Sequence, residues 1–350
     1  MARRSDRPTL RTIAEMTGLA VTTVSRALLD APQIAFETRQ RVQRVAREIG
    51  YQPDRAARHL RTGRTNVISF VLDPHDELLG FSTSMISGLA RALRDTQYHL
   101  VITPHFAEVP SIDPIEYILR NRMADGVVFS RTEPKDPRVK LLMENDFPFV
   151  SHGRTDLGVE HAFVDYDNAA FARMAVERLV SKGRRRLALI LPPDRFMFRR
   201  HLRDGFQEAV ERAGVASELP GDINLDSNAA DLYAWLTWRL RQPDPPDGMV
   251  CAGEVSALSI MAALSDQGLT VGRDFDLVVK QTSLLYDEVR PRIDAVYEDI
   301  AEAGENLGRL LIRRIAGERP GALQLLQEPI PRFADLGHGT RAAIGTHQTA

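Results

Sequence analysis

The segment TLRTIAEMTGLAVTTVSRAL, residues 9–28, predicts two short helices joined by a tight turn. Thr9 can cap the first helix, and Gly18 can adopt the positive φ that ends it. The second helix is expected from Val21 to Leu28. An apolar face joins the two helices at a steep angle and consists of Ile13, Ala14, Leu19, Val24 and Leu28. This pattern is typical of a helix-turn-helix motif, in which the start of the second helix enters the DNA major groove.

The exposed side of the second helix carries side chains suited to reading DNA. A solvent-facing valine such as Val21 is explained if it meets a thymine methyl group, and Thr22 and Arg26 can reach base edges. The residues predicted to contact DNA in this motif are Thr9, Leu10, Val21, Thr22, Thr23, Ser25 and Arg26.

A third helix and a short hinge segment are predicted next. The third helix, residues 36–49, adds apolar side chains to the same core. Asp54 can cap a two-turn helix over residues 54–61, which is too short to be stable alone and needs a second copy and DNA to form. Leu60 has no local core, so it is either a wedge between base pairs of the minor groove or part of an ordinary linker. The DNA contacts predicted in this segment are Arg55, Ala57, Arg58 and Leu60.

The charge distribution separates the first sixty residues from the rest. Residues 1–64 hold 13 arginines, no lysine and six acidic side chains, a net charge of +7. The whole chain has a net charge of −2, so the remaining residues carry −9. A basic head on an acidic body places the surface that binds a polyanion in the head.

Composition and motifs exclude several classes of protein. A single cysteine, Cys251, excludes a disulfide framework and a multi-cysteine zinc site. No apolar stretch follows the basic N-terminus or is long enough to span a bilayer, so a cytosolic protein is expected. No nucleophile-elbow, P-loop or dinucleotide-binding motif occurs, and the histidines lack metal-ligand spacing. We therefore expect no enzyme activity, no catalytic residue, no metal and no cofactor.

From residue 66 onward the pattern predicts an α/β body. Short apolar strands alternate with amphipathic helices, which implies parallel sheets built from right-handed crossovers. The predicted strands are residues 67–72, 100–103, 126–129, 148–151, 187–191, 249–252 and 277–279. A break in this rhythm near residues 162–168 indicates two similar lobes. Ligands of such sheets bind beyond the carboxyl ends of the strands, here in the cleft between lobes.

The residues that follow these strand ends are the candidates for a small-molecule site. They combine charged, hydrogen-bonding and aromatic side chains, a mixture typical of sugar sites. The predicted effector contacts are Asp73, Phe81, Ser130, Arg131, His152, Arg154, Asp167, Phe198, Arg200, Glu254, Lys280 and Gln281. Each has an ordinary alternative: Arg131 can be a surface charge, and Asp167 can simply cap the next helix.

Residues 9–72 resemble the head of the LacI/GalR family of bacterial repressors. The similarity runs through TVSRAL, TRQRV, IGYQPD and AARHLRTG in the family's order and spacing. It implies that Val21 and Thr22 read bases, that Arg26 contacts bases or backbone, and that Leu60 intercalates at the operator centre. Ala20 departs from the family, which usually has a serine there, and this removes a helix cap or a phosphate contact.

The remainder, to about Leu336, resembles the family's effector domain, which is related to periplasmic sugar-binding proteins. The resemblance implies a DNA-binding domain (1–53), a hinge (54–65) and an effector and dimerisation domain (66–340). Lobe one would comprise 66–164 and 293–326, and lobe two 165–292 and 327–340. The chain would then cross between lobes near 163–166, 290–294 and 325–330.

Two departures bear on the ligand. Leu202 stands where the family has an arginine three residues before a glycine, and Arg200 or Arg203 is a candidate substitute. Lys280-Gln281-Thr282-Ser283 replaces the family's glycine–aromatic–Asp-Asp sequence, so an effector-binding aspartate is missing. Either the ligand is anionic, such as a sugar phosphate or sugar acid, or Lys280 varies within a subgroup that binds neutral glycosides. Two stretches are similar to regulators of α-glucoside uptake.

The combined expectation is a repressor that binds a pseudo-palindromic operator as a homodimer. A sugar would bind between the lobes and change the spacing of the hinges. The C-terminal residues 337–350 lack the leucine heptads of the family's tetramers, which favours a dimer. The rivals are a periplasmic binding protein, which would lack the DNA-binding head, an enzyme on the same sheet, and a regulator that responds to a protein partner.

Overall fold

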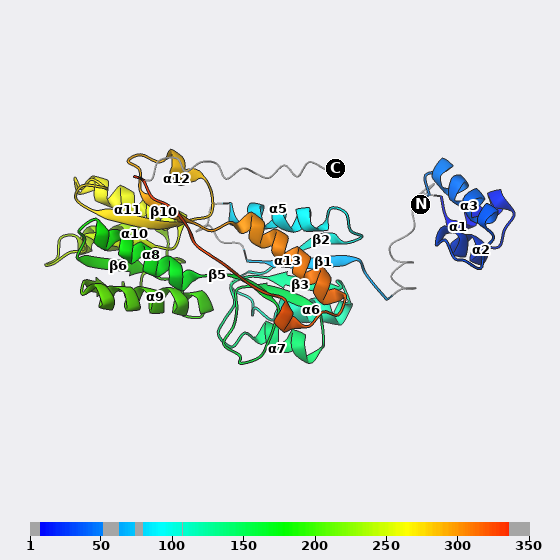
Figure 1. The fold of residues 1–350 in the computed structure, drawn as a ribbon, viewed down its shortest axis with the longest axis horizontal. Helices are drawn as coiled ribbons and strands as arrows, with labels where there is room; N and C mark the ends of the chain where they lie inside the picture. Colours follow the sequence, from blue (N-terminus) through cyan, green and yellow to red (C-terminus); the bar gives the residue numbers. More distant parts are fainter. Residues whose placement is uncertain (1–7, 52–62, 74–79, 107, 336–350) are drawn as a thin grey trace. The chain divides into compact units, whose positions relative to one another are not determined.

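The chain divides into two compact units, residues 1–65 and 66–350. The computed structural model describes residues 8–51, 63–73, 80–106 and 108–335 (Figure 1). The predicted hinge helix, with Arg55, Ala57, Arg58 and Leu60, lies outside the described residues, and so does the C-terminal segment 337–350.

The N-terminal unit contains the predicted helix-turn-helix. Its helices are α1 (Leu10–Thr17), α2 (Val21–Leu28) and α3 (Phe36–Glu48). The Thr9 hydroxyl accepts a hydrogen bond from the backbone N–H of Thr12 at 3.3 Å, and Gly18 ends α1 at φ 70°. Ala20 begins α2 without a side-chain cap. The core contains the predicted Ile13, Ala14 and Val24, and both the helices and their apolar face are confirmed.

The first lobe of the body is a parallel sheet covered by helices on both faces. Apolar, fully buried runs form its central strands, as expected for a parallel sheet. The strand order is β11 (Gln324–Gln327), β5 (Phe163–Tyr166), β4 (Phe149–His152), β3 (Gly126–Phe129), β1 (Val67–Leu72) and β2 (His99–Pro104). One face is covered by α5 (Phe81–Leu93) and α13 (Ile300–Ile315), and the other by α6 (Asp113–Asn121) and α7 (Pro137–Glu144) (Figure 1).

Helices α5 and α13 join segments far apart in the sequence. Their backbones approach so closely that a Cβ atom on Gly88 would overlap the carbonyl group of Ala301. Gly304 allows the same approach from α13, where a Cβ atom would crowd the carbonyl of Met85. Glycine is therefore required at both positions because a side chain would push the helices apart.

The second lobe repeats the arrangement. Its strand order is β12 (Ile330–Arg332), β10 (Asp294–Tyr297), β9 (Asp276–Gln281), β8 (Gly248–Cys251), β6 (Arg186–Ile190) and β7 (Ala216–Glu218). Only β12 runs antiparallel to its neighbour among the strands paired in the described residues. The helices of this lobe are α8 (Asn168–Ser181), α9 (Met197–Ala213), α10 (Ala229–Arg239), α11 (Glu254–Asp266) and α12 (Leu285–Glu288). A 3₁₀ turn, Pro320–Ala322, precedes β11.

The chain passes between the sheets after β5, after β10 and after β11. The predicted start of the returning segment at residue 293 is wrong. Strand β10 pairs with β9 in the second sheet, so the passage follows Tyr297 and α13 begins at Ile300. The physical reason is that Ala295 and Val296 are buried in the core of the second lobe. Similarly, β5 keeps the first lobe's sheet intact to Tyr166, two residues beyond the predicted boundary at 164.

No helix in the described ranges combines the length and the apolar character needed to cross a bilayer.

Candidate effector pocket and DNA-binding surface

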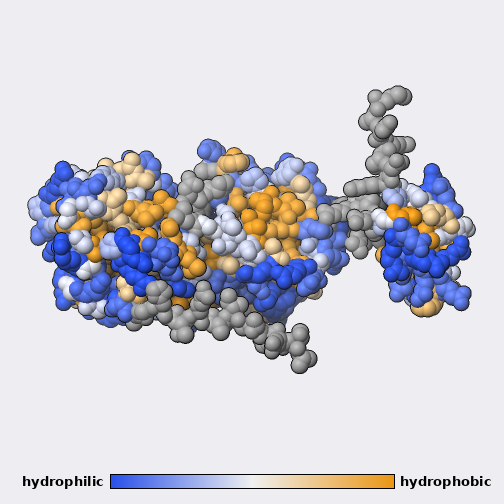
Figure 2. Space-filling model, turned by 90° about the horizontal axis from the view of Figure 1, so that it is seen from above, coloured by the Kyte–Doolittle hydropathy of each residue, from blue (hydrophilic) through white to orange (hydrophobic). Residues whose placement is uncertain are grey.

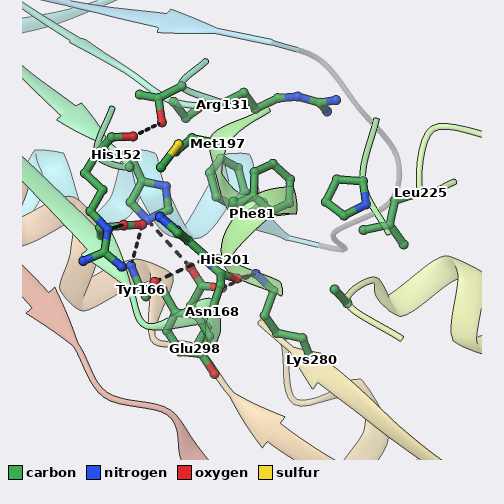
Figure 3. Close-up of a pocket in the computed structure, with 18 of the residues that line it drawn as sticks. Phe81, Arg131, His152, Tyr166, Asn168, Met197, His201, Leu225, Lys280 and Glu298 are labelled. Carbon is green, nitrogen blue, oxygen red and sulfur yellow. Dashed lines mark hydrogen bonds and ion pairs between the residues drawn. The ribbon is translucent and has the colours of Figure 1, made fainter. Parts of the chain in front are cut away.

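A cavity lies between the two lobes, where the carboxyl ends of both sheets face each other. It encloses about 750 Å³, part of which is open to solvent. Ligand sites typically have mostly apolar walls with a few convergent polar groups. Figure 3 shows Arg131 along one side of this cavity, and Lys280 and Glu298 together at another.

Seven of the predicted effector contacts line the cavity. Ser130 and Arg131 follow β3, His152 is the last residue of β4, and Lys280 lies near the end of β9. The complete set is Phe81, Ser130, Arg131, His152, Arg154, Phe198 and Lys280. The strand-end rule found these residues because parallel strands deliver their carboxyl ends to one edge.

Three predicted residues lie outside the cavity, and their side chains form hydrogen bonds with backbone groups instead. The carboxylate of Asp167 accepts from the N–H of Ala170 at 2.8 Å and caps α8. Glu254 is buried and accepts from the N–H groups of Thr282 and Ser283 at 3.0 and 2.9 Å. It therefore fixes the loop after β9. Gln281 is also buried, and its side-chain amide donates to the Ser283 carbonyl at 2.6 Å.

Two further predicted residues are directed elsewhere. Asp73 contacts the His105 ring and lines a neighbouring cavity. Arg200 is exposed and pairs with Asp156 at 3.1 Å, outside both cavities. Arg203 pairs with its neighbour Asp204 on the surface. Neither arginine therefore replaces the missing side chain at Leu202, which is part of the second lobe's core.

Several residues of the cavity were missed by sequence analysis. Glu298 was missed because β10, the strand that it directly follows, was not among the predicted strands. His201 lies on α9 four residues after Met197, so helical spacing could have found it. The remaining unpredicted lining residues are Thr132, Gly153, Asp165, Tyr166, Asn168, Pro192, Met197, Leu225, Asp226 and Ala252.

Lys280 is neutralised inside the protein. Its ammonium group is buried, 2.8 Å from Glu298 Oε2 and 3.2 Å from Asn168 Oδ1 (Figure 3). The rings of Tyr166 and Phe198 lie 5.1 and 5.8 Å from it. Lys280 therefore has its counter-charge in the second lobe and is not itself an unpaired positive charge in the cavity.

The other two cations of the cavity are paired in the same way. Arg131 donates to Asp226 at 2.7 Å, and Arg154 Nε lies 3.1 Å from Asp165 Oδ2. Burial raises the pKa of the Asp165 carboxyl to about 6, although the Arg154 guanidinium opposes that shift. Near pH 7 each cation that lines the cavity thus faces a carboxylate.

The groups left for a ligand include neutral ones, and one oxygen each of Asp165 and Glu298 also lacks a hydrogen bond although it lies near a cation. Burial lowers the pKa of His201 to about 4, and burial also lowers the pKa of His152, with Glu298 opposing the shift. Within the described part of the chain, His152 Nε2, His201 Nδ1 and the Tyr166 hydroxyl are buried without a hydrogen-bond partner. Such groups are costly to bury unless something pairs with them. Phe81 lies against His152, with ring centroids 5.8 Å apart, and supplies an apolar wall.

The N-terminal unit presents the predicted DNA-reading side chains at its surface. Val21 is 42% exposed although it is apolar, and Thr22 and Arg26 are exposed beside it on α2. Thr9 is exposed at the start of α1, while Leu10, Thr23 and Ser25 are half-buried. An exposed valine between polar neighbours is the arrangement that contact with a thymine methyl would explain.

Comparison with known proteins assigns this chain to a family. Residues 9–54 match the model of bacterial regulatory proteins of the lacI family, and residues 176–333 match a periplasmic binding protein-like domain. The HTH-type transcriptional regulator CelR of Thermobifida fusca is 30% identical over 335 residues, covering 93% of this chain and 97% of CelR. The chain belongs to the LacI family. This LacI-family protein is therefore a DNA-binding transcriptional regulator and not an enzyme.

Other relatives and structures agree with the assignment to the LacI family. The regulator AglR of Rhizobium meliloti is 31% identical over 290 residues, 81% of this chain and 79% of AglR. A structure described as the CelR–cellobiose complex is 26% identical and superposes with a TM-score of 0.67 over 93% of this chain and 98% of that one. The Lac repressor dimer bound to operator, 19% identical with the same coverage, shares the fold with a TM-score of 0.79.

Proposed function

We propose that this LacI-family regulator is a repressor whose affinity for its operator is controlled by a neutral sugar bound between the lobes. The observation that carries the proposal is the charge pairing in the cavity. Arg131, Arg154 and Lys280 each have a carboxylate partner, while neutral imidazole and phenol groups lack hydrogen bonds, although His152 Nε2 lies 3.7 Å from Glu298 Oε1. Uncharged hydroxyl groups can both donate to and accept from such partners.

The relatives support the same class of ligand. One solved structure is described as a CelR–cellobiose complex, and the present chain matches that structure over nearly its whole length. An anionic metabolite, such as a sugar phosphate or sugar acid, would instead need a cation without a partner. Lys280 does not provide one because Glu298 already lies 2.8 Å away.

A ligand screen tests the proposal. The purified protein is heated with monosaccharides, disaccharides, sugar phosphates and sugar acids, and its melting point is recorded. A ligand at 100 times its Kd stabilises the folded state by ~2.7 kcal/mol, a shift of several degrees. We expect a neutral sugar to raise the melting point and to change the affinity for a DNA fragment selected in vitro by the protein. If only anionic sugars raise the melting point, the effector is not a neutral sugar. If no sugar raises it, the effector is not a sugar.

We further propose that the regulator acts in the bacterial cytoplasm, at the nucleoid, as a homodimer on a pseudo-palindromic operator. In this arrangement α2 of each copy enters one major groove, with Val21, Thr22 and Arg26 toward the bases. The contacts predicted for Arg55, Ala57, Arg58 and Leu60 remain sequence predictions.

Exposed apolar side chains on both lobes support a second copy as partner. Val101 and Ile102 project from β2, the edge strand of the first sheet, and Leu258 projects from α11. Leu284 is 60% exposed in the loop that Glu254 fixes, and Leu285 follows it. Figure 2 shows hydrophobic surface gathered on each lobe of the body. Apolar patches of this kind mark interaction surfaces, and an edge strand is a natural site for contact with another chain.

The double variant Ile102→Asp, Leu284→Asp is therefore expected to be monomeric at concentrations where the wild type is dimeric. Buried carboxylates would have to be desolvated at the interface, which costs several kcal/mol. Sedimentation velocity measures the difference. Tyr117→Asp is the matched control, because Tyr117 is exposed on α6, which packs on the opposite face of the first sheet from α5. Equal sedimentation of the double variant and the wild type would contradict this interface.

A further inference from the structure

We propose that the ion pair between Arg131 and Asp226 is a wall that limits the length of the effector. The inference rests on the proposed sugar function and adds a selection by ligand size. Arg131 belongs to the first lobe, between β3 and α7, and Asp226 to the second, ahead of α10. The pair closes one end of the effector cavity by joining the lobes across it.

The wall separates two cavities. Arg131, Leu225 and Asp226 line both the effector cavity and a second, more open cavity of about 1,700 Å³, much of it open to solvent. Figure 3 shows Arg131 and Leu225 on the side of the effector cavity away from Glu298. A ligand held near Lys280 and too long for the first cavity must therefore pass through the position that the pair occupies.

The pair is held firmly in the first lobe. Arg131 has a left-handed backbone conformation, φ 55°, and its carbonyl accepts from Arg138 Nη2 at 3.0 Å. Arg138 is only 2% exposed and donates to both oxygens of Asp136, which is fully buried, at 3.0 and 2.7 Å. A residue other than glycine keeps this conformation only where its surroundings impose it. The buried Asp136–Arg138 pair imposes it here and so positions the wall.

The side chain of Arg131 is equally constrained. Its Nη2 donates to both oxygens of Asp226 at 2.9 and 2.7 Å, and its guanidinium lies 4.2 Å from the centroid of the Phe196 ring. Asp226 is fixed in turn, since its N–H donates to Asn224 Oδ1 at 2.9 Å. The wall is thus a charged, stacked contact rather than a mobile surface side chain.

The space beyond the wall suits a further sugar unit. Glu133, Ser227 and Asn228 line it with hydrogen-bonding groups, and Phe196 forms part of its side. Removal of the Arg131 side chain would uncover the part of the Phe196 ring that its guanidinium contacts, while Arg195, 4.6 Å from the ring centroid, would remain. Asp226 would still have a positive neighbour, because Arg195 lies 3.9 Å from it, and it would still be solvated, because the Asp226 side chain is 35% exposed. We therefore expect an Arg131→Ala variant to fold.

The test compares ligand lengths. Wild type and Arg131→Ala are titrated by calorimetry with glucose and with malto- and cello-oligosaccharides of two, three and four units. For the wild type, affinity in the series it binds should fall by about tenfold or more at the first length that reaches the wall, because that ligand must break the pair. In Arg131→Ala the longer ligands should bind within about threefold of the shorter ones. Asp226→Ala should show the same altered length profile.

Arg200→Ala is the matched control. Arg200 and Asp156 form another ion pair between the lobes, at 3.1 Å, but line neither cavity. If Arg131 merely holds the lobes together, Arg131→Ala and Arg200→Ala will weaken all lengths by similar factors. That result, or an unchanged length profile in Arg131→Ala, would overturn the proposal that the pair limits ligand length, while the proposed sugar function would stand. Failure of the wild type to bind any sugar overturns the sugar function, and the wall with it.

Discussion

Replacement of Lys280 by methionine is expected to lower the free energy of unfolding by about 3–5 kcal/mol, the usual cost of removing one partner of a buried ion pair. Glu298 would remain as a buried carboxylate without its ammonium partner, since Lys280 Nζ now lies 2.8 Å from Glu298 Oε2. Asn168 Oδ1 would lose its donor at 3.2 Å as well. Methionine has a similar length and volume, so the loss reflects charge more than shape.

Urea unfolding of the two proteins measures this difference. The double variant Lys280→Met, Glu298→Gln is the control, because it removes both charges and keeps the volume. We expect it to recover most of the lost stability, while sugar binding is impaired because the cavity has lost the ammonium group of Lys280 and the carboxylate of Glu298. If the single variant were as stable as the wild type, the pair would not be the buried, dry contact that the distances indicate.

The second large effect is expected on DNA. Arg26→Ala should weaken operator binding by about 2–6 kcal/mol in a dimer, taking ~1–3 kcal/mol for each base contact and one contact in each half-site. Arg26 is exposed on α2 beside Val21 and Thr22, so its loss leaves no hole in the core. The measurement is fluorescence anisotropy at fixed salt with a DNA fragment selected in vitro by the wild type, since phosphate contacts are salt-dependent.

Arg44→Ala is the matched control for Arg26→Ala. Arg44 is exposed on α3 and pairs only loosely with Glu48 at 3.8 Å, so its removal deletes the same charge from another helix. It should reduce affinity slightly and equally for all sequences. The melting shift with the sugar should be unchanged in Arg26→Ala, because the two units of the chain are separate. A loss of sugar binding in a folded Arg26→Ala protein would contradict that separation.

The DNA-binding unit was predictable because its signals are local. Thr9, Gly18 and the apolar positions between them act within one or two helical turns, and the structure places α1 and α2 where the spacing predicts. Seven strands of the body were also predictable, since buried parallel strands are continuous apolar runs, but β5, β7, β10, β11 and β12 were not among the predicted strands. The ends of the predicted strands differ from prediction by one or two residues in several cases, as at β2 and β9.

The effector pocket was predictable only in part. The rule that ligands sit after strand ends found Arg131 and His152, but the same rule also selected Asp167 and Glu254, which bind backbone N–H groups instead. A carboxylate near a helix start or a loop has two possible tasks, and the residue type does not distinguish them. Which task it performs depends on which backbone the fold brings within hydrogen-bond distance.

By itself, the sequence determined that the protein has a basic helix-turn-helix head and a two-lobed α/β body, because helix caps, periodicity and charge act over a few residues. Only the tertiary structure decided the role of Lys280. Its partner Glu298 follows β10, a strand that was not predicted and whose segment was assigned from sequence to the first lobe. Because the second sheet places β10 beside β9, the lysine meets a carboxylate, and the cavity offers neutral hydrogen-bonding groups instead of a free positive charge.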